Sequence, residues 1–351
     1  MGTSTARILT AVLAVIGSTL AAVPAAQAVP DPELTVTAVT LGRASVAVSG
    51  LNTVAVPVTV KAGYDSDQPW VEKALLNVVL KRTGGSGPVD LIVAGELKRT
   101  AGTARNGTWT GSLHVQSTAN GTFQVDGVVG GTNYDGSDGS MVSPTPFAGP
   151  RIAITGVHQP KLGVSVIPRV VPFGSAYQVK AAVYDSATGK PYGTRILLQV
   201  VRSNLCVEYD AGSRYASTAG LLVTNFEGVY GDVNHCVRIR GRYVDVLKLP
   251  FTPLRPGLVA AVPRLTSAPV GTVVEVDGSV AGRTYRCRVE LQRLYGSTQW
   301  RAVGSASVRA SGRFTLKAQP AYVGNIHYRA FFPACHHYQQ GVSRSFVIRG
   351  S

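Results

Sequence analysis

The chain has 351 residues, a formal net charge of +15 and a composition that is 45% hydrophobic but only 15% charged. It contains 39 glycines, 20 prolines and two methionines, and long segments of helical period are missing, which excludes a mainly helical protein. The length exceeds what one small core can organise, so we expect two or three domains built from short strands and tight turns.

The first 28 residues predict a secretory signal peptide. Arg7 supplies the positive charge, the run from Ile8 to Val23 is apolar, and Ala26-Gln27-Ala28 gives a small-x-small cleavage pattern. The apolar run is too short for a good membrane span, although a retained N-terminal anchor is the alternative. The residue after the cut, Val29, is not a lipid-accepting cysteine, and no sorting tail closes the chain. We therefore expect a secreted, extracellular protein without a membrane span in its mature form.

Proline-rich stretches divide the remaining chain into three segments, residues 29–149, 150–255 and 256–351. Each has about the size of one β-sandwich domain, roughly 100 residues. Apolar and polar residues alternate in LTVTAVTL and VAVPVTVKA of the first segment and in VEVDGSV and RFTLKA of the third. Such alternation predicts antiparallel sheets with one buried and one wet face. In the first segment Asn106-Gly107 and Asn120-Gly121 are typical of tight hairpin turns.

The four cysteines predict two disulfides. An even number of cysteines in an exported chain is most simply explained in this way, although three connectivities exist. The proline-rich stretch LPFTPLRPG, from Leu249 to Gly257, separates the first two cysteines from the last two. We therefore favour the pairs Cys206–Cys236 and Cys287–Cys335.

The order of strand-like stretches in the third segment resembles a known family. Its carrying residues are Gly271-x-Val273, Val289-x-Leu291-Gln292-Arg293, Trp300-x-x-Val303, Gly312-x-Phe314 and Tyr328-Arg329. The segment is similar to immunoglobulin-like or fibronectin III-like repeats of exported proteins from actinobacteria and other Gram-positive bacteria. The middle segment repeats the theme loosely, and the first is assigned from alternation alone. The alternation and the resemblance together predict an all-β chain of three tandem antiparallel immunoglobulin-like β-sandwich domains.

The same resemblance implies where the cysteines lie. Family strands C and F are antiparallel neighbours, and in both later segments one cysteine falls on each of them. Adjacent antiparallel strands are close enough for a disulfide. Family repeats commonly lack cysteines, so Cys287 and Cys335 depart from the pattern. Because Cys236 shares its strand face with Arg238 and Arg240, we expect the middle bond on the wet side of its sheet.

Positive charge is concentrated in the two later segments. The first segment has a net charge of −2, the middle one +7 and the third +9. Arg238 and Arg240 share one strand face, as do Arg286 and Arg288, so these four residues could bind an anion. A well-solvated outer face, or a genome rich in G and C, is the alternative explanation. The partners considered are an anionic cell-wall polymer, a polysaccharide or another extracellular protein, attracted at long range. Nucleic acid is not expected, because no nucleic-acid fold signature is present.

Metal sites have weaker support. The loops YDSDQ and NYDGSDGS would offer calcium the carboxylates of Asp65, Asp67, Asp135 and Asp138 if the loops converged. Zinc is disfavoured at Cys335-His336-His337, because an oxidised cysteine is no ligand and adjacent histidines on an extended segment point to opposite faces. We expect His336 and His337 to lie on an exposed loop. Apart from calcium, no cofactor is expected.

Catalytic motifs of hydrolases, metalloproteases and nucleotide-binding enzymes are missing from the sequence. Trp70, Trp109 and Trp300 are candidates for a sugar platform, although buried tryptophans are more usual in sandwiches. We therefore predict a non-enzymatic binding or structural protein that associates with anionic cell-envelope polymers. The alternatives are an extracellular carbohydrate-related enzyme or accessory module, with its site in the first domain, and a calcium-stabilised adhesin.

Overall fold

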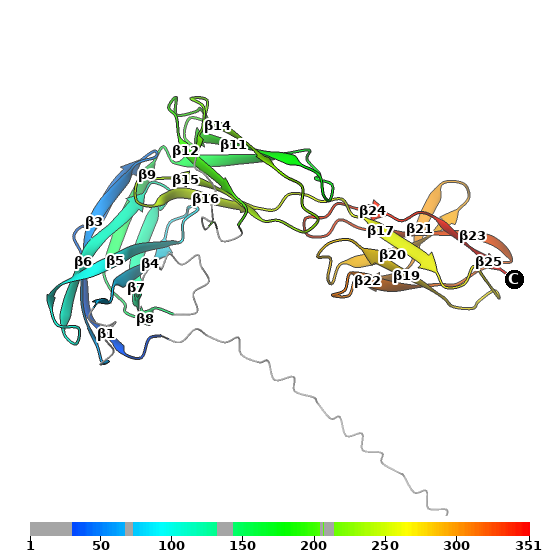
Figure 1. The fold of residues 1–351 in the computed structure, drawn as a ribbon, viewed down its shortest axis with the longest axis horizontal. Helices are drawn as coiled ribbons and strands as arrows, with labels where there is room; N and C mark the ends of the chain where they lie inside the picture. Colours follow the sequence, from blue (N-terminus) through cyan, green and yellow to red (C-terminus); the bar gives the residue numbers. More distant parts are fainter. Residues whose placement is uncertain (1–29, 67–72, 132–142, 204–205, 207–213) are drawn as a thin grey trace, which may run out of the picture.

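The computed structural model describes residues 30–66, 73–131, 143–203, 206 and 214–351. Every named element in these ranges is a β-strand, and the buried residues form three large hydrophobic clusters, one in each third of the chain. The predicted all-β fold class is therefore confirmed. The predicted signal peptide lies outside the described residues. Figure 1 shows the three units following one another along the molecule.

The first unit folds one long sheet into two layers around the first cluster. Its strands are β1 (Leu34–Leu41), β2 (Ser45–Ser49), β3 (Thr53–Tyr64), β4 (Leu76–Gly84), β5 (Leu91–Gly102), β6 (Gly107–Gln116), β7 (Gly121–Gly130), β8 (Thr145–Pro146) and β9 (Arg151–Val157). They lie in the order β1-β3-β6-β5-β4-β7-β9-β2, with β8 beside β7. Strand β5 pairs with β4 before Lys98 and with β6 from Lys98 onward. Glu96, at a φ of 56°, lies where the strand passes between the layers.

Two details of the first unit differ from the sequence-based expectation. The predicted boundary at Gly149 is wrong, because β9 pairs with β7 and β2 and so belongs to the first unit. The proline-rich stretch before it is no linker, since Phe147 packs on the first cluster. Asn106-Gly107 lies in a hairpin between β5 and β6 as predicted. Asn120-Gly121 instead connects β6 to β7, which pair with other strands.

The middle unit is a sandwich of two sheets around the third cluster. Its strands are β10 (Pro160–Ile167), β11 (Tyr177–Asp185), β12 (Leu197–Val201), β13 (Arg214–Tyr215), β14 (Leu221–Phe226), β15 (His235–Arg240) and β16 (Asp245–Phe251). One sheet has the order β10-β11-β14 and the other β13-β12-β15-β16. The antiparallel pairing of β12 with β15 is the one that the family resemblance implied for strands C and F.

The third unit is a sandwich around the second cluster. Its strands are β17 (Val259–Pro263), β18 (Ser267–Ala268), β19 (Val274–Val280), β20 (Arg288–Tyr295), β21 (Gln299–Ser307), β22 (Arg313–Ala318), β23 (Gly324–Phe332), β24 (Gly341–Val342) and β25 (Phe346–Gly350). The small sheet has the order β17-β19-β22 and the large one β18-β25-β23-β20-β21, with β24 beside β23. Here too the implied pair of strands, β20 and β23, lies side by side and antiparallel.

The first and middle units contact each other through side chains as well as through the chain between them. The Thr118 hydroxyl donates a hydrogen bond to the carbonyl oxygen of Val246. The rings of His114 and Tyr243 stack with their centroids 4.1 Å apart. Leu51 of the first unit packs on the hydrophobic cluster of the middle unit. These contacts join the two units across their shared end (Figure 1).

The proline-rich stretch between the middle and third units is a packed joint built on Arg255. This side chain is only 1% exposed, and its guanidinium donates to the carbonyls of Val171 and Pro172, at 3.2 Å each, and of Gly231, at 2.9 Å. A buried guanidinium needs such acceptors, because an unpaired buried charge is costly. Its backbone nitrogen donates to the carbonyl oxygen of His337, at 2.8 Å. Arg255 therefore binds the middle unit with its side chain and the third unit with its backbone.

Candidate anion-binding site

The two arginines predicted to bind anions in the middle unit are engaged within the protein. Arg238 is buried, with its guanidinium 2.7 Å from the carboxylate of Asp245 and 3.2 Å from the side-chain oxygen of Gln199. Arg240 lies opposite Asp245 in the strand pairing and contacts the same carboxylate at 3.1 Å. Arg238 is therefore not available to an external anion, because it is buried and β16 places Asp245 beside it, whereas the partly exposed Arg240 shares that carboxylate and its anion-binding role stays a prediction.

Both predicted disulfides are present. The Cα atoms of Cys206 and Cys236 are 5.2 Å apart, and those of Cys287 and Cys335 are 6.1 Å apart. Cys236 was expected on the wet side of its sheet, but it is fully buried with Cys206 and Val201 in a small cluster of its own. The face of β15 that bears Cys236 and Arg238 is therefore covered, which the alternation of the strand alone does not reveal.

The third-unit arginines of the prediction are exposed. Arg286 precedes β20 in a left-handed conformation, at a φ of 64°, with its guanidinium 5.1 Å from the centre of the Tyr285 ring. Arg288 lies 3.7 Å from the carboxylate of Glu290. Because the backbone turns at Arg286, the two arginines do not continue one alternating strand. Their role in anion binding stays a prediction.

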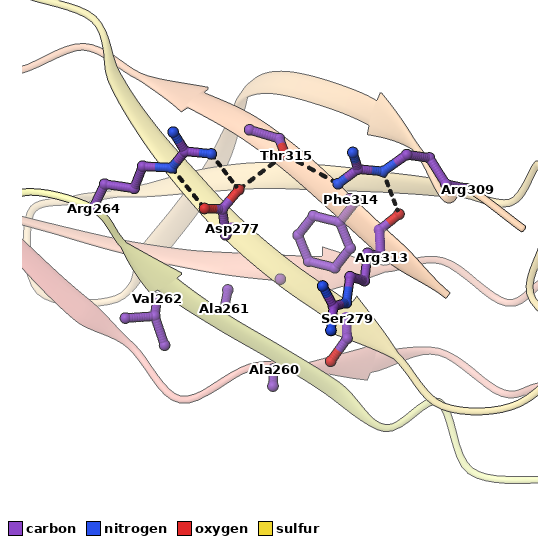
Figure 2. A pocket seen from close by; sticks show the side chains of 11 residues that line it. Ala260, Ala261, Val262, Arg264, Asp277, Ser279, Arg309, Arg313, Phe314 and Thr315 are labelled. Atoms are coloured by element: carbon purple, nitrogen blue, oxygen red, sulfur yellow. Dashed lines mark hydrogen bonds and ion pairs between the residues drawn. The ribbon is translucent and has the colours of Figure 1, made fainter. Parts of the chain in front are cut away.

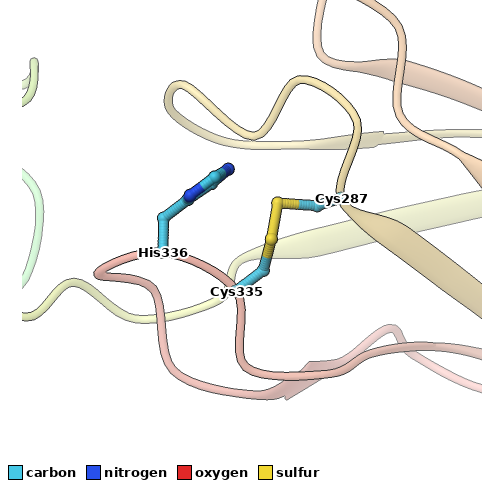
Figure 3. Close-up of side chains that lie close together, drawn as sticks. All are labelled: Cys287, Cys335 and His336. Atoms are coloured by element: carbon cyan, nitrogen blue, oxygen red, sulfur yellow. A yellow bond between two sulfur atoms is a disulfide. The ribbon is translucent and has the colours of Figure 1, made fainter.

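The Cys287, Cys335 and His336 group has the spacing of metal ligands, with all three potential ligand atoms within 4.8 Å of one another. Figure 3 shows the two sulfurs bonded to each other, with His336 beside them. The sulfurs are therefore not thiolate ligands in this structure. His336 is exposed as predicted. His337 is not on an exposed loop, because it is half-buried with its imidazole 3.1 Å from the carboxylate of Asp232.

Asp232 joins the middle unit to the third. It accepts a hydrogen bond from the hydroxyl of Tyr338 and lies beside the His337 imidazole. Burial and the neighbouring carboxylate raise the pKa of Tyr338 above its ordinary range, so the hydroxyl keeps the proton that it donates. Cys335 and Tyr338 exchange two backbone hydrogen bonds across the turn. The disulfide therefore anchors the turn that carries both contacts to Asp232.

Trp109, the first-unit tryptophan that the structure describes, is not part of a sugar platform. Trp109 is fully buried and donates its indole hydrogen to the carbonyl oxygen of Ala74, at 3.0 Å. Trp300 is half-buried, with the guanidinium of Arg329 4.3 Å from its ring centre. Trp70 lies outside the described residues.

The predicted calcium loops are mostly outside the described residues as well, because Asp67, Asp135 and Asp138 fall there. Asp65 is described, and its carboxylate lies 3.0 Å from the guanidinium of Arg105. A calcium site and an enzyme site in the first unit therefore stay predictions.

A groove that sequence reasoning missed lies on the outer face of the small sheet of the third unit, with a volume of about 490 Å³. The lining residues come from β17, β19, β22 and the loops beside them: Ala260, Ala261, Val262, Arg264, Asp277, Gly278, Ser279, Arg309, Arg313, Phe314 and Thr315. Figure 2 shows Arg264 and Asp277 at one end and Arg309 and Arg313 at the other.

A chain of polar contacts organises the groove around Asp277. Arg264 reaches one oxygen of Asp277 at 2.7 Å and the carboxylate of Glu275 at 2.7 Å. The Thr315 hydroxyl donates to Asp277 at 2.9 Å, and Arg309 donates to the Thr315 hydroxyl at 3.3 Å. The bonds from Arg264, followed by the one from Thr315, lower the pKa of Asp277, so this carboxylate stays charged. Asp277 and Glu275 are thus committed to Arg264.

The two remaining arginines of the groove have no such carboxylate. Arg309 donates its Nε hydrogen to the carbonyl oxygen of Arg313, at 3.3 Å, and neither arginine forms an ion pair within the described part of the chain. On the opposite wall Val262 is 67% exposed. The groove therefore combines two uncompensated cations with an apolar wall.

The sequence did contain one signal for this groove. In β22 the residues Arg313, Thr315 and Lys317 alternate with buried ones, and they lie opposite Ser279, Asp277 and Glu275 of β19. Alternation placed these side chains on a wet face, but it did not show which strands would be neighbours. Arg309, which precedes β22, had no signal of its own.

Comparisons with known proteins give little beyond the architecture. No family model and no curated protein matches the chain. Among solved structures, FdeC, an Escherichia coli adhesin, is 13% identical with a TM-score of 0.31, over 90% of this chain and 96% of that one. The D0-D1 domain of intimin is 10% identical with a TM-score of 0.21, over 54% and 97%. A family 2 glycosyl hydrolase from Bacteroides cellulosilyticus is 10% identical with a TM-score of 0.21, over 55% and 29%.

At these TM-scores the likenesses carry no argument about function, and the fold rests on the strand order described above. An actinobacterial or other Gram-positive origin finds no support in them and stays a prediction. Within the described ranges, no helix has the length and hydropathy that crossing a membrane requires.

Proposed function

We propose that this chain is an exported, non-enzymatic binding protein whose third unit attaches to an anionic polymer of the cell envelope. The observation that carries the proposal is the pair Arg309 and Arg313, adjacent cations without an ion pair in the described structure, on a segment with a net charge of +9. Clustered like charge attracts a polyanion from a distance and raises its rate of association.

Export is supported by two independent features. The first 28 residues carry a signal-peptide pattern, and two disulfides are characteristic of proteins in oxidising compartments. In that location the abundant polyanions are wall polymers and acidic polysaccharides. The packed joint at Arg255 suits a spacer that presents its terminal unit in a set orientation.

Retention of the mature chain, residues 29–351, on purified cell walls tests this function. The salt series runs from about 0.05 to 0.5 M, because screening of exposed charges becomes strong near a Debye length of about 10 Å at 0.1 M. We expect retention at low salt, progressive elution as salt rises, and no retention on beads of a neutral polysaccharide. Retention that ignores ionic strength, or none at low salt, contradicts the proposal.

A further inference from the structure

The groove of the third unit places exposed arginines beside an apolar wall, an arrangement that negative charge on a ligand does not by itself require. We infer that it binds a uronate, a carboxylate-bearing sugar ring of an acidic polysaccharide, with Arg309 and Arg313 holding the carboxylate and Val262 facing the ring. This inference rests on the proposed function and names the substrate class of its binding site. It combines the two walls of the groove, the cationic one and the apolar one (Figure 2).

The cationic wall is oriented before any ligand arrives. Arg309 is held by its bonds to the Thr315 hydroxyl and to the Arg313 carbonyl oxygen, both at 3.3 Å. These two bonds use two of the five N–H donors of its guanidinium and leave the rest for a ligand. A planar fork of N–H groups matches a carboxylate, and a side chain already fixed loses less entropy on binding. Arg313 follows on the same wall, at the first position of β22.

The acidic residues near the groove cancel only part of this charge. Arg264 contacts both Asp277, at 2.7 Å, and Glu275, at 2.7 Å, so this group of one cation and two anions has a net charge of −1, and together with Arg309 and Arg313 the site keeps a net charge of +1. Thr315 links that group to Arg309 through its hydroxyl, which both accepts and donates. An incoming carboxylate would therefore meet Arg309 and Arg313 at the end of the groove that lies away from Arg264 and Asp277 (Figure 2).

The apolar wall gives the reason for a sugar ring. Ala260 and the 67%-exposed Val262 lie along β17, and the buried ring of Phe314 packs against Gly278 beneath the groove. A pyranose ring presents apolar C–H groups on its faces, and small-molecule sites typically pair apolar walls with a few placed polar groups. The volume of about 490 Å³ is within the range of such sites, about 300–1,000 Å³.

A phosphodiester polymer offers the same negative charge without a ring. The repeating unit of a glycerol phosphate chain is thin and polar throughout, so Val262 and Ala260 would find no apolar counterpart in it. The two sources of an oxyanion can therefore be separated by experiment, and the apolar wall favours the uronate.

The test is a titration of the mature chain with three soluble oligomers of similar length, followed by calorimetry or by ligand-observed NMR. The first is a galacturonate oligomer, the second is the same oligomer with its carboxylates methyl-esterified, and the third is a glycerol phosphate oligomer. We expect the galacturonate oligomer to bind at least tenfold more tightly than either of the others. Equal binding of the glycerol phosphate oligomer would show an anion site without a sugar preference and would overturn the inference.

Matched double variants separate the groove from net charge. Arg309→Ala/Arg313→Ala and Arg344→Ala/Arg349→Ala each remove two positive charges from exposed positions of the third unit, but only the first pair lines the groove. We expect the groove variant to weaken galacturonate binding by roughly tenfold or more, since each lost bond to a charged group is strong. The control variant should change it by less than about threefold, as expected for screened charges.

The results distinguish wall binding by the whole chain from uronate binding in the groove. Equal losses in both double variants would leave salt-dependent wall binding intact but would remove the groove as its site. If the chain binds none of the three oligomers and is not retained on cell walls, the proposed function itself is contradicted. As a second measurement, Val262→Ser should weaken galacturonate binding about two- to fivefold while leaving the melting temperature unchanged, because Val262 is mostly exposed. An unaltered affinity in that variant would remove the apolar wall from the inference.

Discussion

The middle and third units have the same two-sheet architecture but differ in the ion pairing of their arginines. Both are two-sheet sandwiches in which the strand pair β12–β15 or β20–β23 bears the cysteines or leads to them. In the middle unit Asp245 lies within 4 Å of Arg238, Arg240 and Lys248, so one carboxylate serves three cations. In the third unit two of the three acidic residues contact Arg264 and the third, Glu290, lies beside Arg288, which leaves Arg309 and Arg313 without an ion pair in the described structure. Segment charges of +7 and +9 therefore conceal different surfaces.

The disulfides differ in the same sense. Cys206–Cys236 is enclosed in the middle unit, whereas Cys287–Cys335 anchors the turn that contacts Asp232 of the neighbouring unit. One bond therefore stabilises its own sandwich, and the other also supports a joint. Four measurements test whether the two units differ in this way.

The largest effect is expected from Asp245→Asn. This change leaves the buried guanidinium of Arg238 without its carboxylate, and breaking a buried pair by removing one partner costs about 3–5 kcal/mol. The matched change Asp277→Asn affects exposed, solvent-screened ion pairs and should cost far less stability than Asp245→Asn. Urea unfolding of the full chain, followed separately for the middle and third units, measures both. Similar losses in the two variants would contradict the contrast drawn between the units.

Removing either disulfide should destabilise its unit, and only one should loosen the joint. Loops of 30 and 48 residues correspond to roughly 4 kcal/mol each on the chain-entropy model. In Cys287→Ser/Cys335→Ser the turn bearing His337 and Tyr338 loses its anchor. Proteolysis near Arg255 should therefore accelerate, and the radius of gyration in solution should increase. Cys206→Ser/Cys236→Ser is the control. An equal change in protease sensitivity at Arg255 in both variants would disprove the link between bond and joint.

Mild acid should destabilise the middle unit. His235 is fully buried, with its Nε2 2.8 Å from the Tyr177 hydroxyl, and burial lowers its pKa to about 4. The unfolded state, with an ordinary pKa near 6.5, binds the proton first, so stability is complete above about pH 6.5 and falls as the pH approaches 4. The loss should reach about 3 kcal/mol. Thermal unfolding of wild type and His235→Phe across this pH range measures the loss. If the wild-type middle unit is as stable at pH 4.5 as at pH 7, His235 is not buried in its neutral form.

The smallest effect is expected at the joint. Asp232→Asn keeps an acceptor for the Tyr338 hydroxyl but removes the charge beside His337, so the contact should weaken by about 1 kcal/mol. Hydrogen exchange at the amides of Cys335 and Tyr338, which bond each other across the turn, should accelerate several-fold. Unaltered protection in this variant would show that the turn holds its shape without Asp232.

The strands and the disulfide pairing could be predicted from the sequence. Which residues cover each face of a strand could not. Period-two alternation identified β19 and β22 because one face of each is buried, and the order of strands placed each cysteine near its partner. The burial of Arg238 was missed because it depends on where β16 places Asp245, which is a matter of register. The boundary at Gly149 was misplaced because a proline-rich stretch can pack on a core as well as link two.

The groove was missed for a related reason. Its residues come from β17, β19 and the β22 region, which are separated along the chain, and local patterning does not report which distant segments become neighbours. The alternation of apolar and polar residues also does not distinguish arginines that form ion pairs from arginines that do not. The distinction between a neutralised and an available guanidinium requires the position of every nearby carboxylate.

The turn between Cys335 and Tyr338 also decides which way the terminal unit faces. With Tyr338 and His337 fixed on Asp232, and Arg255 tied to the backbone on both sides, rotation about the long axis is blocked at that point. A filament lying in the groove would consequently meet the rest of the molecule at one azimuth. The orientation of a bound polysaccharide relative to the other two units would thus depend on four residues that do not line the groove.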